Sequence, residues 1–176
     1  MSARVISDAF WNKIDTRDGL SSDHPYCGIS KEGGDMSSET STPTPLTRGV
    51  DHVGLAVRDL AATRAFFTDC LNFKLIGERD SYPAAFVSDG VTMITLWQVS
   101  SPATAIGFDR RNNVGLHHLA FKVASEADLR AVFAKIAAWP NVVVEFAPEP
   151  SGKGPKIHCM FAEPSGNRIE VAFDPR

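Results

Sequence analysis

Two stretches of this chain match each other at a constant offset of 66 residues. The offset carries His52 onto His118, Val57 onto Val123, Asp59 onto Ser125, Arg64 onto Arg130 and Phe67 onto Phe133. A repeat of this kind indicates two copies of one supersecondary unit, neither of which can bury its hydrophobic face alone. We therefore expect the two copies to pack together, and we expect any site between them to take its residues in pairs.

Each copy has the side-chain pattern of one strand, one helix and three further strands. In the first copy the strands are expected at 50–57, 73–79, 84–90 and 91–99, with a helix at 60–71 after the N-cap Asp59. In the second copy they are expected at 116–123, 142–148, 156–162 and 167–173, with a helix at 127–139 after Ser125. The predicted fold class is α+β, with two βαβββ modules forming a half-open sheet around a central cavity.

The segment before the repeat has a different composition. Between residues 28 and 48, 13 of 21 residues are Gly, Ser, Thr or Pro. Such a segment cannot bury enough apolar surface to offset its ordering entropy. We expect residues 1–48 to form a flexible N-terminal extension and linker, and residues 49–176 to form one domain.

Charge and hydropathy exclude several classes of partner. The formal net charge is −3 and the isoelectric point is near 5.9, which gives no general attraction to nucleic acid or to anionic lipid. No apolar run approaches the roughly 18 residues of a membrane span. The three cysteines (Cys27, Cys70, Cys159) lack CxxC spacing, a usage typical of a reducing compartment. We expect a cytoplasmic protein with a small-molecule partner and no contact with nucleic acid or membrane.

Three candidate metal ligands lie on the polar faces of the expected strands. Side chains alternate across a strand, so His52, His118 and Glu170 fall on faces that otherwise carry small or polar residues, while His117 should point to the opposite side. Two imidazoles and one carboxylate leave open positions on a divalent metal such as Fe(II), and Mn(II), Ni(II), Co(II) or Zn(II) would also fit. A single strand histidine is more often structural and a single glutamate more often solvated. The equivalence of the two histidines under the repeat is what favours a metal site.

Five further residues are candidates for a substrate pocket. Met93, Thr95 and Trp97 share the polar face of one strand, although Met93 and Trp97 could equally be ordinary core residues. Lys153 and Lys156 lie in a Gly- and Pro-containing loop, which could be a lid over an anionic tail or a solvated turn. A structural hydrogen bond is the expected role of His158.

The segments 51–78, 115–123 and 162–172 resemble the vicinal oxygen chelate superfamily, which includes glyoxalase I, methylmalonyl-CoA epimerase, extradiol dioxygenases and the bleomycin and fosfomycin resistance proteins. The resemblance covers residues 49–175. It implies paired βαβββ modules with a metal held by residues of the first and fourth strands of each module. These positions are occupied here by His52, Thr95, His118 and Glu170. Thr95 departs from the Glu or Gln of glyoxalase I and the epimerase, which leaves three ligands.

The resemblance implies a metal-dependent enzyme on a small oxygenated substrate, with glyoxalase-like lyase or isomerase chemistry and Glu170 as the base. An Fe(II)-dependent dioxygenase is an alternative, although Met160 stands where the extradiol signature has Tyr. A fosfomycin-modifying enzyme would have Thr in place of Gly54. A non-catalytic small-molecule-binding protein of the resistance type is a further alternative. We also expect a homodimer, and the site could lie within one chain or be shared between two.

Overall fold

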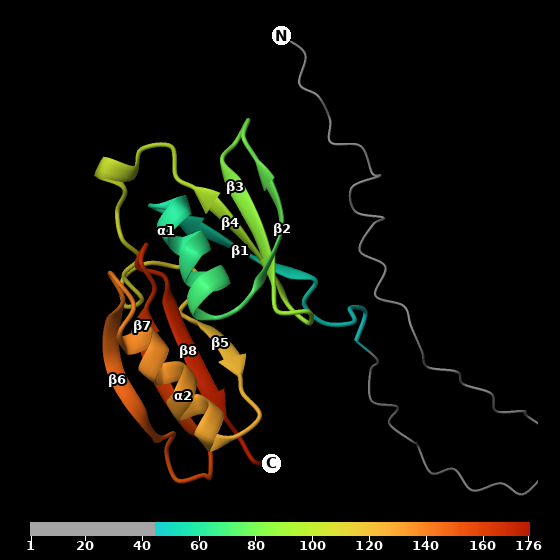
Figure 1. Ribbon diagram of the computed structural model, residues 1–176, viewed down its shortest axis with the longest axis vertical. Coiled ribbons are helices and arrows are strands. Elements are labelled where there is room, and N and C mark those ends of the chain that lie inside the picture. The colour runs from blue at the N-terminus through green and yellow to red at the C-terminus, as the bar shows by residue number, and fades with distance from the viewer. Residues whose placement is uncertain (1–44) are drawn as a thin grey trace, which may run out of the picture. The chain divides into compact units, whose positions relative to one another are not determined.

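The computed structural model describes residues 45–176, which form one compact unit. The expected extension at 1–48 falls almost entirely outside the described residues. In the described part, two four-stranded sheets carry two helices (Figure 1). The fold class is α+β, as the sequence predicted.

The first module runs from β1 to β4. Its strands are β1 (His52–Val57), β2 (Lys74–Arg79), β3 (Ala84–Ser88) and β4 (Met93–Gln98). The sheet order is β1-β4-β3-β2, with β1 parallel to β4 and the other pairs antiparallel. Helix α1 (Leu60–Ala65) follows β1 and continues as a π-helical turn, Phe66–Cys70.

The second module repeats this arrangement. Its strands are β5 (Leu119–Lys122), β6 (Val143–Pro150), β7 (Ile157–Ala162) and β8 (Arg168–Phe173), with helix α2 (Glu126–Ala137) after β5. The order is β5-β8-β7-β6, again with one parallel pair, β5 and β8. The shared topology confirms the duplication predicted from the offset of 66 residues.

Both helices begin at the caps that the sequence predicted. The Asp59 carboxylate accepts a hydrogen bond from the Ala62 backbone amide at 2.9 Å, and the Ser125 hydroxyl accepts one from the Asp128 amide at 3.1 Å. These bonds satisfy N–H groups that have no partner inside the helix. A short Pro102–Thr104 3-10 helix lies in the connection between the modules. In the described residues, no helix has the length and hydropathy to cross a membrane.

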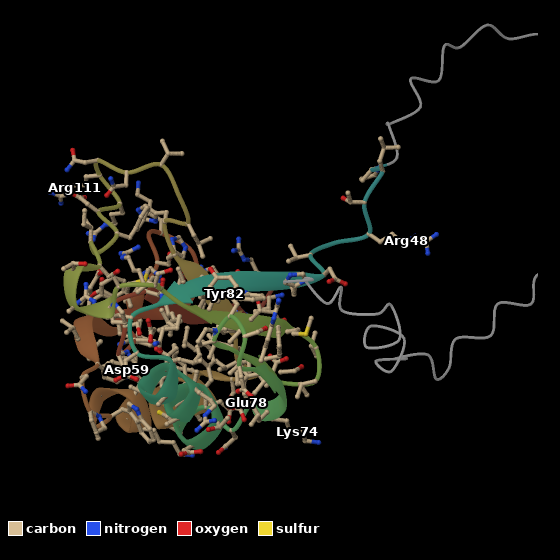
Figure 2. All side chains as sticks on the ribbon, turned by 90° about the horizontal axis from the view of Figure 1, so that it is seen from above. Arg48, Asp59, Lys74, Glu78, Tyr82 and Arg111 are labelled. Carbon is tan, nitrogen blue, oxygen red and sulfur yellow. The ribbon has the colours of Figure 1, made fainter. Side chains whose placement is uncertain are left out.

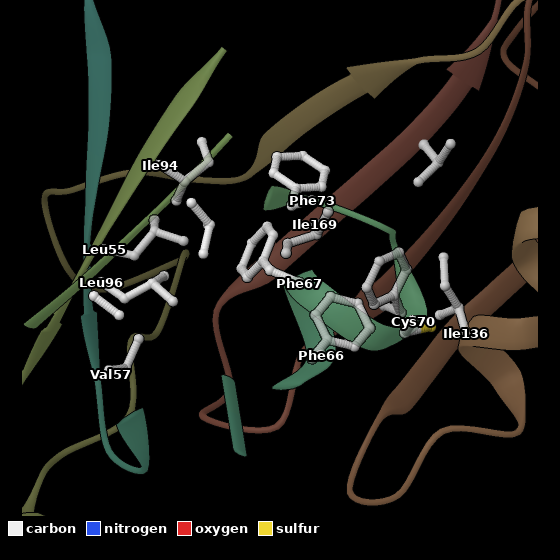
Figure 3. Packing of buried hydrophobic residues seen from close by; sticks show 14 of the residues in the cluster. Leu55, Val57, Phe66, Phe67, Cys70, Phe73, Ile94, Leu96, Ile136 and Ile169 are labelled. Atoms are coloured by element: carbon white, nitrogen blue, oxygen red, sulfur yellow. The ribbon is translucent and has the colours of Figure 1, made fainter. Parts of the chain in front are cut away.

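One hydrophobic core joins the two modules. It contains the apolar faces of both sheets, and the aromatic side chains of the π-helical turn connect them (Figure 3). The ring of Phe66 lies 5.8 Å from that of Phe161, and the ring of Phe67 lies 6.3 Å from that of Phe121, centroid to centroid. Because each apolar face points into this core, the polar faces of the two sheets point away from it.

A buried polar network also links the modules. The Glu163 carboxylate, in the turn between β7 and β8, accepts a hydrogen bond from the Thr63 hydroxyl of α1 at 2.7 Å. Ser165 accepts hydrogen bonds from the backbone amides of Arg58 and Asp59, both at 3.0 Å. The start of β8, and with it Glu170, is therefore held at a fixed place against the first module.

Candidate metal and substrate site

The strand registers of the two modules are equivalent at the residues that lie two positions after His52 and His118. Gly54 pairs with Thr95 between β1 and β4, and Ala120 pairs with Glu170 between β5 and β8. Gly54 and Ala120 are related by the offset of 66, and each lies two residues after a histidine. Thr95 therefore occupies in the first module the position that Glu170 occupies in the second.

Glu170 is the centre of the polar cluster in the second module. Its side chain is only 6% exposed, and three basic side chains surround it. His118 Nε2 lies 3.1 Å from Oε2, while Lys156 Nζ lies 2.7 Å and His158 Nδ1 lies 2.9 Å from Oε1. Burial by itself would raise the pKa of Glu170, but the hydrogen bonds and positive charges of Lys156 and His158 outweigh it and lower the pKa. Glu170 is thus held as a carboxylate.

His52 lies on the polar face of the other sheet. Its Nδ1 atom is 2.7 Å from the Asp51 carboxylate and its side chain is 39% exposed. Within residues 45–176, no three His, Cys, Asp or Glu side chains are grouped closely enough to hold one metal ion. The structure therefore brings together two of the three predicted ligands, His118 and Glu170, and does not group His52 with them within the described residues. The three-ligand metal site remains a prediction.

The predicted pocket residues of the first module form an aromatic wall. The indole of Trp97 donates a hydrogen bond to the Thr95 hydroxyl at 2.8 Å, and Thr95 is 1% exposed. The rings of Tyr82 and Phe86 lie 5.2 Å and 5.8 Å from that of Trp97. Tyr82 lies in the turn between β2 and β3 and is labelled in Figure 2. Met93 is partly buried and pairs with His52 between β1 and β4. This wall extends across the same sheet face as His52.

Strict alternation predicted that His117 points to the helix side of the sheet, but in the structure it does not. Strand β5 starts only at Leu119, so the alternation rule does not extend back to His117. Its Nδ1 atom lies 2.8 Å from His118 Nδ1 and 3.4 Å from Arg168 Nη1, and the residue is exposed. Nearby, Arg168 makes two hydrogen bonds of 2.8 Å to the Glu145 carboxylate, which lower the pKa of Glu145. His117 therefore belongs to the polar side of the second sheet.

The contacts of Lys156 and His158 with Glu170 were not predicted from the sequence. His158 was expected to make a structural hydrogen bond, and Lys156 was placed in a loop that could close over a substrate. The register of β7 against β8 is what brings both next to Glu170. Alternation places residues 156, 158 and 160 on one face of their strand, but the sequence does not show which strand pairs with it. Lys153 is exposed in the turn before β7.

A pocket of about 260 Å³ lies where the modules meet. Gly54 and Ala56 of β1, Arg58, Arg168, and Ile106 and Phe108 of the connection between the modules are among the residues that line it. Arg58 donates a hydrogen bond to the backbone oxygen of Ala105 at 2.8 Å. The pocket thus adjoins the polar faces of β1 and β8 without including His52 or Glu170.

Comparison with known proteins assigns this architecture to a family. Residues 49–171 match the model of the glyoxalase/bleomycin resistance protein/dioxygenase superfamily. A catechol-2,3-dioxygenase of Bacillus subtilis (strain 168) is 38% identical over 63 residues, which are 36% of this chain and 21% of that protein. The chain therefore matches only about a fifth of this relative's length.

Solved structures share the fold. A glyoxylase/bleomycin resistance protein/dioxygenase domain from Frankia sp. EAN1pec is 26% identical, with a TM-score of 0.61 over 74% of this chain and 94% of that one. The fosfomycin resistance protein FosX from Listeria monocytogenes is 20% identical, with a TM-score of 0.57 over 73% and 95% of the two chains. A lactoylglutathione lyase from Agrobacterium tumefaciens is 21% identical, with a TM-score of 0.55 over 72% and 94%. The chain belongs to the glyoxalase/bleomycin resistance protein/dioxygenase superfamily.

Proposed function

We propose that this protein is a metal-dependent enzyme acting on a small oxygenated substrate, with glyoxalase-like lyase or isomerase chemistry. The observation that carries the proposal is the contact of His118 with a buried, ionised Glu170, together with the equivalent placement of His52 in the other module. Two imidazoles and a carboxylate fit Fe, Mn, Ni, Co or Zn as divalent ions and leave positions for substrate oxygens. His52, His118 and Glu170 are the proposed ligands.

The proposed ligand set is completed by a second copy of the chain. Within residues 45–176 of one chain, His52 is not grouped with His118 and Glu170, which supports a site that is shared between two chains. In a homodimer, the polar face of the first module of one copy would cover the polar face of the second module of the other. Each of the two sites would then contain one His52 from one chain and the His118–Glu170 pair from the other.

The residues of the chain support the chemistry in distinct ways. A bound divalent metal would polarise two neighbouring substrate oxygens and stabilise the enolate or related oxyanion. The contacts of Lys156 and His158 keep Glu170 ionised, which suits a metal ligand. Trp97, Met93 and Thr95 would line the apolar side of the proposed substrate site, and Lys153 and Lys156 would line its polar side. Glu170 is also the proposed base, a role that its lowered pKa weakens.

An Fe(II)-dependent dioxygenase is the second candidate. The hydroxyl of Thr95 is engaged by Trp97 and buried, which favours three protein ligands, the set typical of Fe(II) oxygenases. The sequence similarity to the Bacillus subtilis catechol-2,3-dioxygenase supports the same candidate. Oxygen consumption that depends on ferrous iron and a catechol would distinguish it from the lyase or isomerase, which would turn over a thiol hemithioacetal or an α-carbonyl thioester without oxygen.

Metal analysis of a mixture of two inactive variants tests the shared site. His52→Ala and His118→Ala should each lose the metal when prepared alone. A heterodimer of the two variants would contain one site with both histidines and one site with neither. Co-expression should therefore restore up to half of the metal content that a dimer of the unmodified protein has. A site within one chain would give no restoration. Full metal content in both single variants would refute the ligand assignment, whereas unmodified protein that binds no metal would favour a non-catalytic binding protein.

A further inference from the structure

We propose that the pocket where the two modules meet is a binding site for a small anion with an apolar part, and that Arg58 binds the anionic group. The volume of the pocket is about 260 Å³. Pockets for drug-sized ligands usually have about 300–1,000 Å³, so this one suits a molecule of about one ring. The pocket includes neither His52 nor Glu170, and the inference therefore does not depend on a metal.

Arg58 is held at this pocket by two contacts. Its backbone amide donates a hydrogen bond to the Ser165 hydroxyl at 3.0 Å, and its Nη2 atom donates one to the backbone oxygen of Ala105 at 2.8 Å. A guanidinium has five N–H donors in one plane, of which the contact with Ala105 uses one. Arg58 thus presents further donors from a fixed place, and pairs of such donors suit the oxygens of an anionic group.

The acidic side chains around the pocket have partners of their own. The residues that line the pocket include no Asp or Glu. Glu145 and Asp109 line the neighbouring hollow of about 250 Å³. Glu145 accepts two hydrogen bonds of 2.8 Å from Arg168 and lies 3.7 Å from Arg110. The Asp109 carboxylate accepts a hydrogen bond from the Arg111 backbone amide at 2.8 Å. Both carboxylates are therefore used by groups other than Arg58.

Two further carboxylates lie near Arg58 and are also engaged elsewhere. Asp59 accepts a hydrogen bond from the Ala62 amide at the start of α1. The buried Glu163 accepts four hydrogen bonds, none of them from Arg58. Within residues 45–176, the guanidinium of Arg58 makes no ion pair with a carboxylate. A ligand that enters the pocket meets this cation and no acid in the wall, which favours an anionic group over a cationic one.

Apolar side chains of the connection between the modules line the other side of the pocket. Ile106 is 95% exposed, Phe108 is 42% exposed and Leu116 is 50% exposed. The ring of Phe108 packs on Gly115, where an added Cβ would lie only 2.7 Å from Cε2 of the ring. The ring is therefore placed by the absence of a side chain at position 115. Large apolar side chains that stay in water at a pocket wall offer a surface that the apolar part of a ligand can cover.

An NMR titration of the full-length protein in the presence of a chelator tests the inference with three probes. Benzenesulfonate is an anion, benzenesulfonamide is a neutral molecule of nearly the same shape, and benzylamine is a cation. We expect the anion to bind about fivefold more tightly than the neutral probe, which is about 1 kcal/mol and the upper range for an ion contact at an exposed side chain. Benzylamine should bind most weakly. The amides of Gly107 and Gly166, which line the pocket, should respond.

Four variants separate the two parts of the site. Arg58→Met should remove the preference for the anion, and Arg58→Lys should keep part of it. The matched control is Arg111→Met in the exposed turn of the same connection, labelled in Figure 2, and it should keep the whole preference. Phe108→Ala should weaken all three probes by a similar factor and leave the preference unchanged, because it removes only apolar contact.

Several outcomes would overturn the inference. A preference that persists in Arg58→Met, or that is lost in Arg111→Met, refutes the role of Arg58. Equal affinities of the three probes refute the anion, and absence of binding refutes the site. A response confined to the amides of His118 and Lys156 would place the anion beside Glu170 instead. Each of these results leaves the proposed metal chemistry untouched, because no metal is present. Thermal unfolding of each variant shows that a lost preference does not reflect a lost fold.

Discussion

Replacing Glu163 with Gln tests the polar link between the modules. The carboxylate is 1% exposed and accepts four hydrogen bonds. Oε2 accepts from the Thr63 hydroxyl at 2.7 Å and the Ser165 backbone amide at 2.9 Å, and Oε1 accepts from the Asn167 backbone amide at 3.0 Å and its side-chain nitrogen at 2.9 Å. Each oxygen therefore faces one backbone N–H.

The geometry sets the magnitude of the effect. Whichever way the new amide is oriented, its NH₂ group replaces an oxygen that accepts from a backbone N–H, and that donor loses its acceptor. A buried donor without a partner costs about 1–3 kcal/mol, and hydrogen bonds to a charged acceptor are the stronger ones. We expect Glu163→Gln to lower the free energy of unfolding by about 2 kcal/mol.

Urea denaturation at pH 7 measures this free energy. The exposed Glu149→Gln is the matched control and should stay within about 0.5 kcal/mol of the unmodified protein. Thr63→Val removes one donor of the same network and should cost about 1 kcal/mol. The double variant should be less destabilised than the sum of the two, because both changes break one shared contact. A loss of under 0.5 kcal/mol in Glu163→Gln, or full additivity, would refute this account.

Three shorter predictions concern other sites. The folded-state pKa of Glu170 lies below its ordinary value of 4.5, so its ion pairs stabilise the protein fully above that pH, and this contribution disappears as the pH falls through the folded pKa. Glu170→Gln should therefore make the loss of stability of metal-free protein at acid pH less steep. An unchanged acid-denaturation profile would contradict this prediction. In a Cys27→Ser variant, a thiol reagent at pH 8 should modify neither Cys70 nor Cys159 until urea is added, because both are buried and burial raises the pKa of Cys159 to about 11. Thr95→Val should lower the free energy of unfolding by about 1 kcal/mol and shift the fluorescence emission of Trp97, because the indole loses its hydrogen-bond acceptor. The metal content should stay unchanged. A loss of metal would identify Thr95 as a ligand.

Much of the fold could be predicted from local patterns. The N-caps Asp59 and Ser125 and the alternation of His52, Gly54 and Ala56 against Val53, Leu55 and Val57 each depend on near neighbours in the chain. Such signals need no knowledge of pairing partners. His117 shows their limit, because strand β5 begins only at Leu119, and the backbone before a strand need not continue its alternation.

The cluster around Glu170 could be predicted only in part. Alternation placed His118 and Glu170 on the polar faces of their strands, and the family resemblance implied that the first and fourth strands of the module bring them together. The places of Lys156 and His158 depend on the antiparallel register of β7, which includes irregularities in its pairing with β6. No local pattern specifies such a register.

The sequence by itself determined the duplicated βαβββ architecture and the three candidate ligands, because periodicity, caps and the repeat are written in short segments. Only the tertiary structure decided that the apolar faces of both sheets meet in one core, and that His52 is not grouped with His118 and Glu170 within the described residues. It also decided that Lys156 and His158 share one oxygen of Glu170. These features arise from contacts between strands and modules, whose geometry is fixed by packing of the whole domain rather than by any single segment.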